Sequence, residues 1–140
     1  MQLHRRIGQA LEAAYGARQM EIAPRLATHF ERGHDDARAV RYLSVAADRA
    51  RLRFANREAL EYLDAALGLL AREPEDNPRR RQQLELCLAR GAVLIDLHGF
   101  ASEEVRRCFE HAGELCAAVG TRQKASGNFA IVSALPKEKT

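Results

Sequence analysis

The sequence predicts an all-helical protein built as a stack of antiparallel helix pairs. Apolar residues recur at the helical spacing of about 3.6 residues almost throughout, and strand-like alternation is nearly absent. Short turns separate the expected helices, so each helix can only pair antiparallel with its neighbours in sequence. Aromatic residues make up 6% of the chain and Trp is missing. A core built mainly from Ala and Leu suits helices that approach one another closely.

The first three helices are expected at residues 2–15, 19–32 and 36–54. Gly16 is a natural stop for the first helix. Pro24 would lie in the first turn of the second helix, where a missing N–H costs little. Gly33 ends the second helix, and Asp35 is a good N-cap for the third. The expected buried faces are Leu3, Ile7, Ala10, Leu11 and Ala14; then Ile22, Ala23, Leu26, Ala27 and Phe30; then Ala39, Tyr42, Leu43, Ala46 and Ala50.

Three more helices are expected at residues 56–71, 78–97 and 102–119, which brings the total to about six. Asn56 and Ser102 would cap the first and last of these helices. A polar connector with two prolines, residues 72–78, separates the fourth helix from the fifth. The expected buried faces are Ala59, Leu60, Leu63, Ala66, Leu67 and Leu70; then Leu84, Leu88, Gly91, Ala92 and Ile95; then Val105, Phe109, Ala112, Leu115, Cys116 and Val119.

The helical pattern weakens after Gly120, so we expect a helical repeat domain over residues 1–120 and a weakly structured tail over 121–140. An internal similarity supports repetition. Residues 36–43 and 56–63 both contain a capping residue, then Ala at the fourth position and Tyr-Leu at the end. The two segments open consecutive helices. Each Ala would let a neighbouring backbone come close while Tyr-Leu fills the gap.

Small and large residues alternate with a spacing that resembles the TPR motif. That motif has a small residue and Leu in its first helix, an aromatic residue three positions after the small one, and Ala, a large residue and Ala in its second helix. The resemblance implies a right-handed α-solenoid of TPR-like helix pairs. The matching residues are Leu26, Ala27 and Phe30 for the first helix and Ala39, Leu43 and Ala46 for the second, with a looser match at Leu88, Gly91, Phe109 and Ala112.

A more specific resemblance is to the helical region of large bacterial predicted ATPases, which include adenylate-cyclase-linked ATPases and LuxR- or MalT-like regulators. The similar segments are residues 3–7 (Leu-His-Arg-Arg-Ile), 26–30 (Leu-Ala-Thr-His-Phe), Gly33 with Asp35, 99–105, and 114–116. The likeness covers about residues 3–120 and implies a fragment of a longer protein. It implies a non-catalytic interaction or sensor module of a signalling ATPase or transcriptional regulator. The implied partners are a protein or a small inducer, and the ATPase domain of the parent protein.

The bulk composition favours a reduced, cytoplasmic chain that binds neither membrane nor nucleic acid. The net charge is +3, and 22 basic residues are interspersed with 19 acidic ones. Three cysteines, an odd number, argue against a disulfide framework. No signal peptide is visible, and no stretch approaches the roughly 18 apolar residues that span a bilayer.

No catalytic, cofactor or metal residue is expected. The sequence lacks the glycine spacing of a phosphate-binding loop. Cys108, His111 and Cys116 share part of one helix face, but Cys87 would have to join them to complete a zinc site, and no C-x-x-C pair exists. The simpler interpretation is that the cysteines are small buried apolar residues. The acidic pairs 35–36 and 103–104 are explained by helix capping.

Two further features have a functional and a structural interpretation. His29 would either contact a ligand or pack against a neighbouring helix, and packing is favoured because nothing pairs with His29 in sequence. The run Arg79–Arg81 would either bind nucleic acid or form a solvated helix start, and the second is favoured because no aromatic residue is nearby. Two alternatives to the sensor module therefore stay open: a free-standing TPR-like adaptor and a helical nucleic-acid-binding protein.

Overall fold

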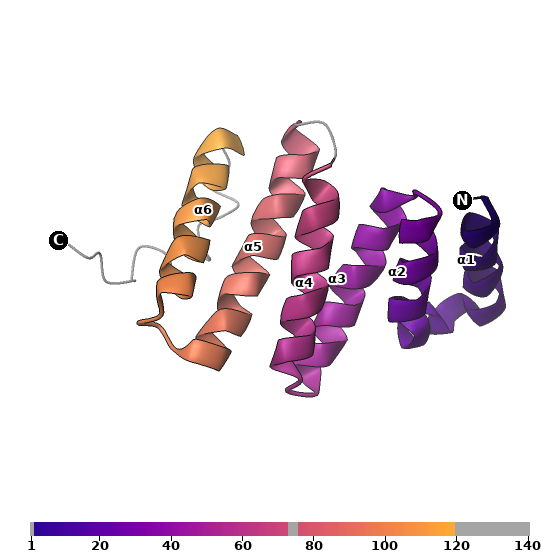
Figure 1. Cartoon of the computed structure of the whole chain (residues 1–140), viewed down its shortest axis with the longest axis horizontal. Coiled ribbons are helices and arrows are strands. Elements are labelled where there is room, and N and C mark those ends of the chain that lie inside the picture. The colour runs from indigo at the N-terminus through magenta and orange to yellow at the C-terminus, as the bar shows by residue number, and fades with distance from the viewer. Residues whose placement is uncertain (1, 73–75, 120–140) are drawn as a thin grey trace. The chain divides into compact units, whose positions relative to one another are not determined.

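A computed structural model describes residues 2–72 and 76–119, with the side chains of Asn77 and Val119 left out. Every regular element in these ranges is a helix, which confirms the all-helical class (Figure 1). The 3-10 segment η1 adds a helical element to the predicted set of about six. The elements are α1 (Gln2–Tyr15), η1 (Gly16–Ile22), α2 (Ala23–Arg32), α3 (Asp36–Leu52), α4 (Asn56–Leu70), α5 (Asn77–His98) and α6 (Glu103–Val119).

The chain divides into two compact units, Met1–Arg72 and Glu73–Thr140. The first unit contains α1 to α4, and the second contains α5 and α6. The division falls within the two-proline connector that the sequence predicts at residues 72–78. The expected helical domain over 1–120 stays a prediction, and the expected tail over 121–140 lies outside the described residues.

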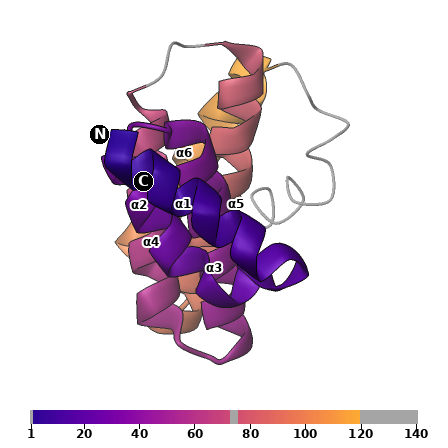
Figure 2. The same cartoon turned by 90° about the vertical axis from the view of Figure 1, so that its right-hand side faces the viewer.

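In the first unit, each helix packs on the next one along the chain, and consecutive helices run in opposite directions (Figure 1). Figure 2 faces α1, which lies in front of α2 and α3. All the residues predicted to be buried in the second and third helices are buried, and Val40 and Ala47 join them. Ala23, Ala39, Ala59 and Ala66 have no exposed surface, so small side chains stand where the backbones come together.

The second helix begins later than predicted. The segment before Pro24 is the 3-10 helix η1, with a kink at Arg18 (φ −98°, ψ 16°), and α2 starts at Ala23. Proline has no N–H to donate, so an α-helix running through from Gln19 would lose the bond from residue 24 to the Met20 carbonyl. The sequence correctly placed Pro24 in the first turn of an α-helix, but it gave that helix an extra turn.

The predicted buried face of α1 is wrong. Leu3 is 67% exposed, Ala10 and Ala14 are exposed, and Ile7 and Leu11 are half-buried. Gly8 is instead the buried residue of this helix. A Cβ built on Gly8 would lie 2.9 Å from Cζ of Phe30, so the missing side chain lets α1 lie directly on that ring. Glycine is far less hydrophobic than Leu3, Ile7 and Leu11, so a hydrophobic pattern selects the side of the helix that carries those residues and not the side with Gly8.

Helix caps follow the sequence at two of three predicted positions. Asp35 Oδ1 accepts a hydrogen bond from the Arg38 amide at 3.2 Å, and Ser102 Oγ accepts from the Glu104 amide at 3.1 Å. Both caps were predicted. Asn56 is not a cap, because the N-cap of α4 is Ala55 and Asn56 is the first helical residue. An additional cap, Asp76, accepts from the Arg79 amide at 2.8 Å and begins α5 one residue before its predicted start.

The inner face of α4 is rotated slightly from its prediction. Ala59, Leu63, Ala66 and Leu70 are buried as expected. Leu60 and Leu67 are only half-buried, and Leu69, which the pattern left out, is 4% exposed. The internal similarity is preserved in part, because Tyr42 of α3 is buried while the matching Tyr62 of α4 is half-buried.

In the second unit, α5 and α6 pack together through Gly91 and Phe109. A Cβ on Gly91 would lie 2.6 Å from Cζ of Phe109, so the ring rests on the bare backbone of α5. This contact repeats the arrangement of Gly8 on Phe30 in the first unit. Val105, Phe109, Ala112 and Cys116 are buried as predicted, while Leu115 is half-buried.

Helix α5 has more buried residues than the single predicted face allows. Leu84 and Gly91 are buried as expected, but Leu88, Ala92 and Ile95 are only half-buried. Leu86 and Val93 lie on the other side of the helix from Gly91, at 6% and 0% exposure. The apolar residues of α5 are therefore distributed around the helix and do not form one stripe. A prediction based on a single apolar stripe identifies only part of the buried surface of this helix.

Candidate functional site

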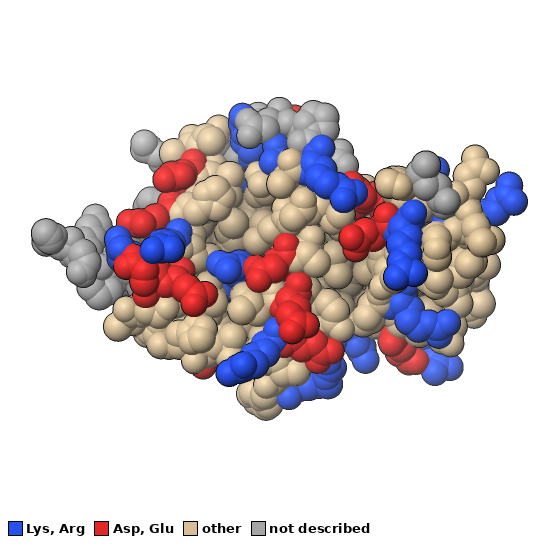
Figure 3. All heavy atoms as spheres, viewed as in Figure 1, with Lys and Arg blue, Asp and Glu red and all other residues tan. Residues whose placement is uncertain are grey.

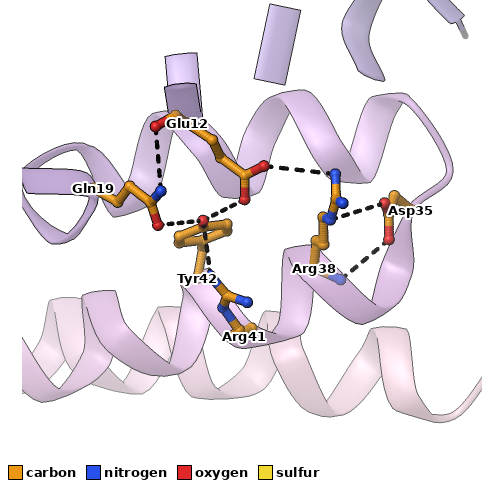
Figure 4. A network of polar contacts seen from close by, with 6 residues as sticks. All are labelled: Glu12, Gln19, Asp35, Arg38, Arg41 and Tyr42. Carbon is orange, nitrogen blue, oxygen red and sulfur yellow. Dashed lines mark hydrogen bonds and ion pairs between the residues drawn. The ribbon is translucent and has the colours of Figure 1, made fainter. Parts of the chain in front are cut away.

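The densest polar cluster in the first unit surrounds the hydroxyl of Tyr42 (Figure 4). Tyr42 is 2% exposed, and its hydroxyl lies 2.5 Å from Glu12 Oε2 and 3.1 Å from Gln19 Oε1. Arg41 Nη2 donates to the same hydroxyl at 3.1 Å. Gln19 also donates to the Glu12 carbonyl at 3.2 Å. The buried hydroxyl thus joins α1, η1 and α3 at one point.

Arg38 extends this cluster along α3. Its Nη1 lies 3.6 Å from Glu12 Oε1, and its Nε lies 3.6 Å from Asp35 Oδ2. The guanidinium also lies over the Phe30 ring, 5.1 Å from the ring centre. Phe30 stacks on Tyr42, with 5.9 Å between ring centres. The Glu12 carboxylate therefore meets a tyrosine and an arginine of α3 that are one helical turn apart.

The surroundings of Tyr42 keep its hydroxyl protonated. Burial raises the pKa of Tyr42 above its ordinary value of 10.0, and the hydrogen bond to the nearby Glu12 carboxylate raises it further, while Arg41 acts in the opposite direction. A neutral hydroxyl is needed to donate to Glu12. The cluster therefore works as a polar latch between helices, and its contacts are among the protein's own side chains.

Sequence reasoning missed the polar half of this cluster. It placed Tyr42 correctly in the core but assigned no role to Glu12, Gln19 or Arg38. One signal was available: a buried tyrosine hydroxyl needs a hydrogen-bond partner, so a carboxylate or amide on an adjacent helix was required. Glu12 is the only acidic residue of α1.

His29 packs against α1, in agreement with the structural interpretation of this residue. Its Nδ1 lies 3.2 Å from Nδ1 of His4, and the two ring centres are 5.5 Å apart. Burial lowers the pKa of His29 below its ordinary value of 6.5, and the charges of His4, Arg25 and Arg32 lower it further. The partner that sequence reasoning lacked is thus a second histidine, 25 residues away.

The residues considered for a metal site do not converge. Cys87, Cys108 and Cys116 are buried, and Cys108 Sγ donates to the Cys87 carbonyl at 3.2 Å. His111 points away into solvent, where its side chain is 55% exposed and its Nδ1 lies 3.7 Å from Glu114. Across the described ranges, no three His, Cys, Asp or Glu side chains lie close enough together to hold a metal ion.

Burial controls the chemistry of the thiol in α5. It raises the pKa of Cys87 to about 11, with the neighbouring Cys108 adding to the effect and Arg90 opposing it. A thiol with this pKa is almost entirely protonated near neutral pH, and the thiolate is the reactive form. The environment of Cys87 is therefore that of a packing residue.

The basic run at the start of α5 is less solvated than predicted. Arg81 is exposed, but Arg79 and Arg80 are half-buried. On the face shown in Figure 3, basic and acidic side chains are mixed rather than collected into a patch of one sign. Within the described ranges, the large apolar side chains exposed on the surface are Leu3, Met20, Leu52, Phe54 and Phe100.

None of the helices in residues 2–72 and 76–119 combines the length and apolar character that crossing a membrane requires. In comparison with known proteins, the chain is 32% identical over 113 residues to an uncharacterized protein of Rhizobium meliloti. The aligned part is 81% of this chain but 11% of that protein, so the chain spans about a tenth of the relative's length. No family model matches the sequence. No solved structure gives a significant match either.

Proposed function

We propose that the chain is a non-catalytic, TPR-like interaction or sensor module of a larger signalling ATPase or transcriptional regulator. The observation that carries the proposal is the sequential packing of α1 to α4, in which each helix buries residues against the next. Such packing builds an elongated structure from repeated units and leaves broad helix surfaces for partners. A right-handed α-solenoid with TPR-like helix pairs is the proposed architecture.

Two details of the packing support a repeated unit. The Gly8–Phe30 contact of α1 and α2 has a counterpart in the Gly91–Phe109 contact of α5 and α6. In each case the first helix of a pair offers bare backbone and the second offers an aromatic ring. TPR-like pairs also alternate small and large residues across the two helices.

The length of the relative supports a role as part of a longer protein. A segment that aligns with only 11% of a protein is one component among many in that protein. We propose that the parent carries an ATPase domain and that the module binds a protein or a small inducer and communicates its presence to that domain. The proposed location is the cytoplasm of a bacterium.

The test is to find the polypeptide that carries this chain in its source cells. An antiserum raised against the purified chain is used for immunoblotting, and the reactive band is identified by mass spectrometry. We expect a band far larger than the chain's own 15.6 kDa, containing peptides of a phosphate-loop ATPase. A single band at the size of the chain refutes the parent protein and favours the free-standing adaptor.

A second measurement separates the module from a nucleic-acid-binding protein. Fluorescence anisotropy with a labelled DNA duplex is recorded at low and at physiological salt. We expect weak binding that Arg81→Gln does not change. Tight binding that falls steeply with salt, and weakens in Arg81→Gln, would favour the nucleic-acid alternative and contradict the proposal.

A further inference from the structure

The contact between His4 and His29 is a place where one proton decides whether two helices attract or repel. The two Nδ1 atoms are 3.2 Å apart, which is hydrogen-bond distance. Such a bond requires one Nδ1 to carry a hydrogen and the other to offer its lone pair. When both imidazoles are charged, all four ring nitrogens carry hydrogens, and the same contact brings two cations face to face.

The charged groups around the pair provide no negative charge that would stabilise a second proton on it. On α2, the charges that act on His29 are those of Arg25 and Arg32, both positive. On α1, His4 is followed directly by Arg5 and Arg6. The carboxylate of Glu12 accepts a hydrogen bond from Tyr42 of α3. Several other charged groups of the adjoining elements are held by partners: Arg38 by Asp35, Asp36 by Arg72, Arg41 by Tyr42, and Arg18 by Glu21 in η1. The carboxylate of α2 belongs to Glu31, which is exposed and, two residues after His29, projects from nearly the opposite side of the helix.

Helix α1 has few other attachments that would hold it in place against this repulsion. Gly8 is its buried residue and rests on Phe30. Arg5 Nη2 donates to the His34 carbonyl at 3.5 Å, at the limit of a hydrogen bond. The polar latch at Glu12 lies two turns away from His4. A Cβ built on Gly33 would lie 2.8 Å from the Arg5 amide nitrogen, so the first turn of α1 is held by this close backbone packing and by the imidazole pair.

We propose that the imidazole pair makes the docking of α1 depend on pH, with α1 packed on α2 while at most one ring is charged and released when both rings are charged. Release uncovers the ring of Phe30 and the hydroxyl of Tyr42. The lowered pKa of His29 agrees with this proposal, because it means that the docked state resists protonation. The unfolded chain takes up a proton near the ordinary value of 6.5 that the docked state resists, so docking is strongest above that pH and weakens as the pH falls through it.

Hydrogen–deuterium exchange of the whole chain tests this proposal. Protection factors, which remove the intrinsic pH dependence of exchange, are measured between pH 7.5 and 5 with EDTA present to exclude bound metal. We expect the amides of α1 to lose protection as the pH falls while those of α3 and α4 keep theirs, because charging both rings weakens only the docking of α1.

Two variants show whether the imidazoles cause the effect. His4→Gln keeps a side chain that donates and accepts hydrogen bonds but cannot take up a proton, so α1 should become nearly insensitive to pH. His34→Asn is the matched control, since residue 34 has a positive φ of 60° that Asn tolerates and its ring is outside the pair. It should behave as the parent does. His29→Gln repeats the test from α2 if the first variant does not fold at pH 7.5.

The proposal is wrong if α1 and α3 lose protection in parallel as the pH falls, because that result describes acid unfolding of the whole unit. It is also wrong if His4→Gln retains the pH dependence of the parent chain.

Discussion

Replacing Gly91 with alanine should destabilise the second unit, although the same change normally stabilises a helix. In a helix interior, alanine is favoured over glycine by about 1 kcal/mol. At position 91 the new Cβ would lie 2.6 Å and 2.8 Å from two carbons of the Phe109 ring. These distances are well inside van der Waals contact, so the ring or the backbone of α5 must move.

The energy of this clash exceeds the gain in helix propensity. Overpacking a core typically costs about 1–3 kcal/mol. Phe109 is 3% exposed, so its ring is enclosed by other residues, which places the cost toward the upper part of that range. After the gain of about 1 kcal/mol from alanine is taken into account, we expect Gly91→Ala to lower the free energy of unfolding by roughly 1–2 kcal/mol.

Urea denaturation followed by circular dichroism measures the effect, with Gly113→Ala of α6 as the matched control. Gly113 has no atom within 4 Å of the position that its Cβ would take, so alanine there should raise stability by about 0.5–1 kcal/mol. A double variant, Gly91→Ala with Phe109→Leu, should recover part of the loss because the smaller side chain makes room. The reasoning is refuted if Gly91→Ala stabilises the protein as much as Gly113→Ala does.

Three further changes follow from the cores and the polar latch. Leu43→Asp places a charge at a position that is 6% exposed between packed helices; we expect a loss of more than about 4 kcal/mol, and an unchanged thermal melt would show that Leu43 is not buried in solution. Tyr42→Phe removes the hydroxyl that joins Glu12 and Gln19; we expect a loss of about 1–2 kcal/mol by thermal melting, whereas Tyr62→Phe, at a half-buried position, should cost less. Alkylation of Cys87 by iodoacetamide at pH 8, followed by peptide mass spectrometry, should be at least about a hundredfold slower in the folded protein than in urea, because its pKa of about 11 leaves little thiolate; equal rates would contradict its buried position.

Local sequence signals predicted the helices well because each signal acts within one turn. Asp35 and Ser102 cap their helices as expected, since a cap needs only its own side chain and the amides two or three residues later. The late start of α2 is also a local effect of Pro24, and attention to the missing N–H would have placed it correctly. Burial in α2 and α3 followed from spacing because both helices present one continuous apolar stripe.

The orientation of α1 was not accessible to the same reasoning. Its apolar stripe, with Leu3 and Ile7, is real in the sequence, but the helix packs through Gly8, His4 and Glu12. That choice depends on Phe30, His29 and Tyr42, which lie 20 to 30 residues away and reach α1 only after the fold has formed. The site residues were missed for the same cause, because each polar contact pairs side chains from different helices.

The close fit of a bare backbone against an aromatic ring also has a consequence for how such chains diverge. A substitution at position 8 alone meets Phe30, and enlargement of the ring alone meets the backbone of α1. Related sequences can avoid this steric clash only by changing positions 8 and 30 nearly together. Positions 8 and 30, and likewise 91 and 109, should therefore covary among related sequences. The exposed positions of α1 should vary independently of them.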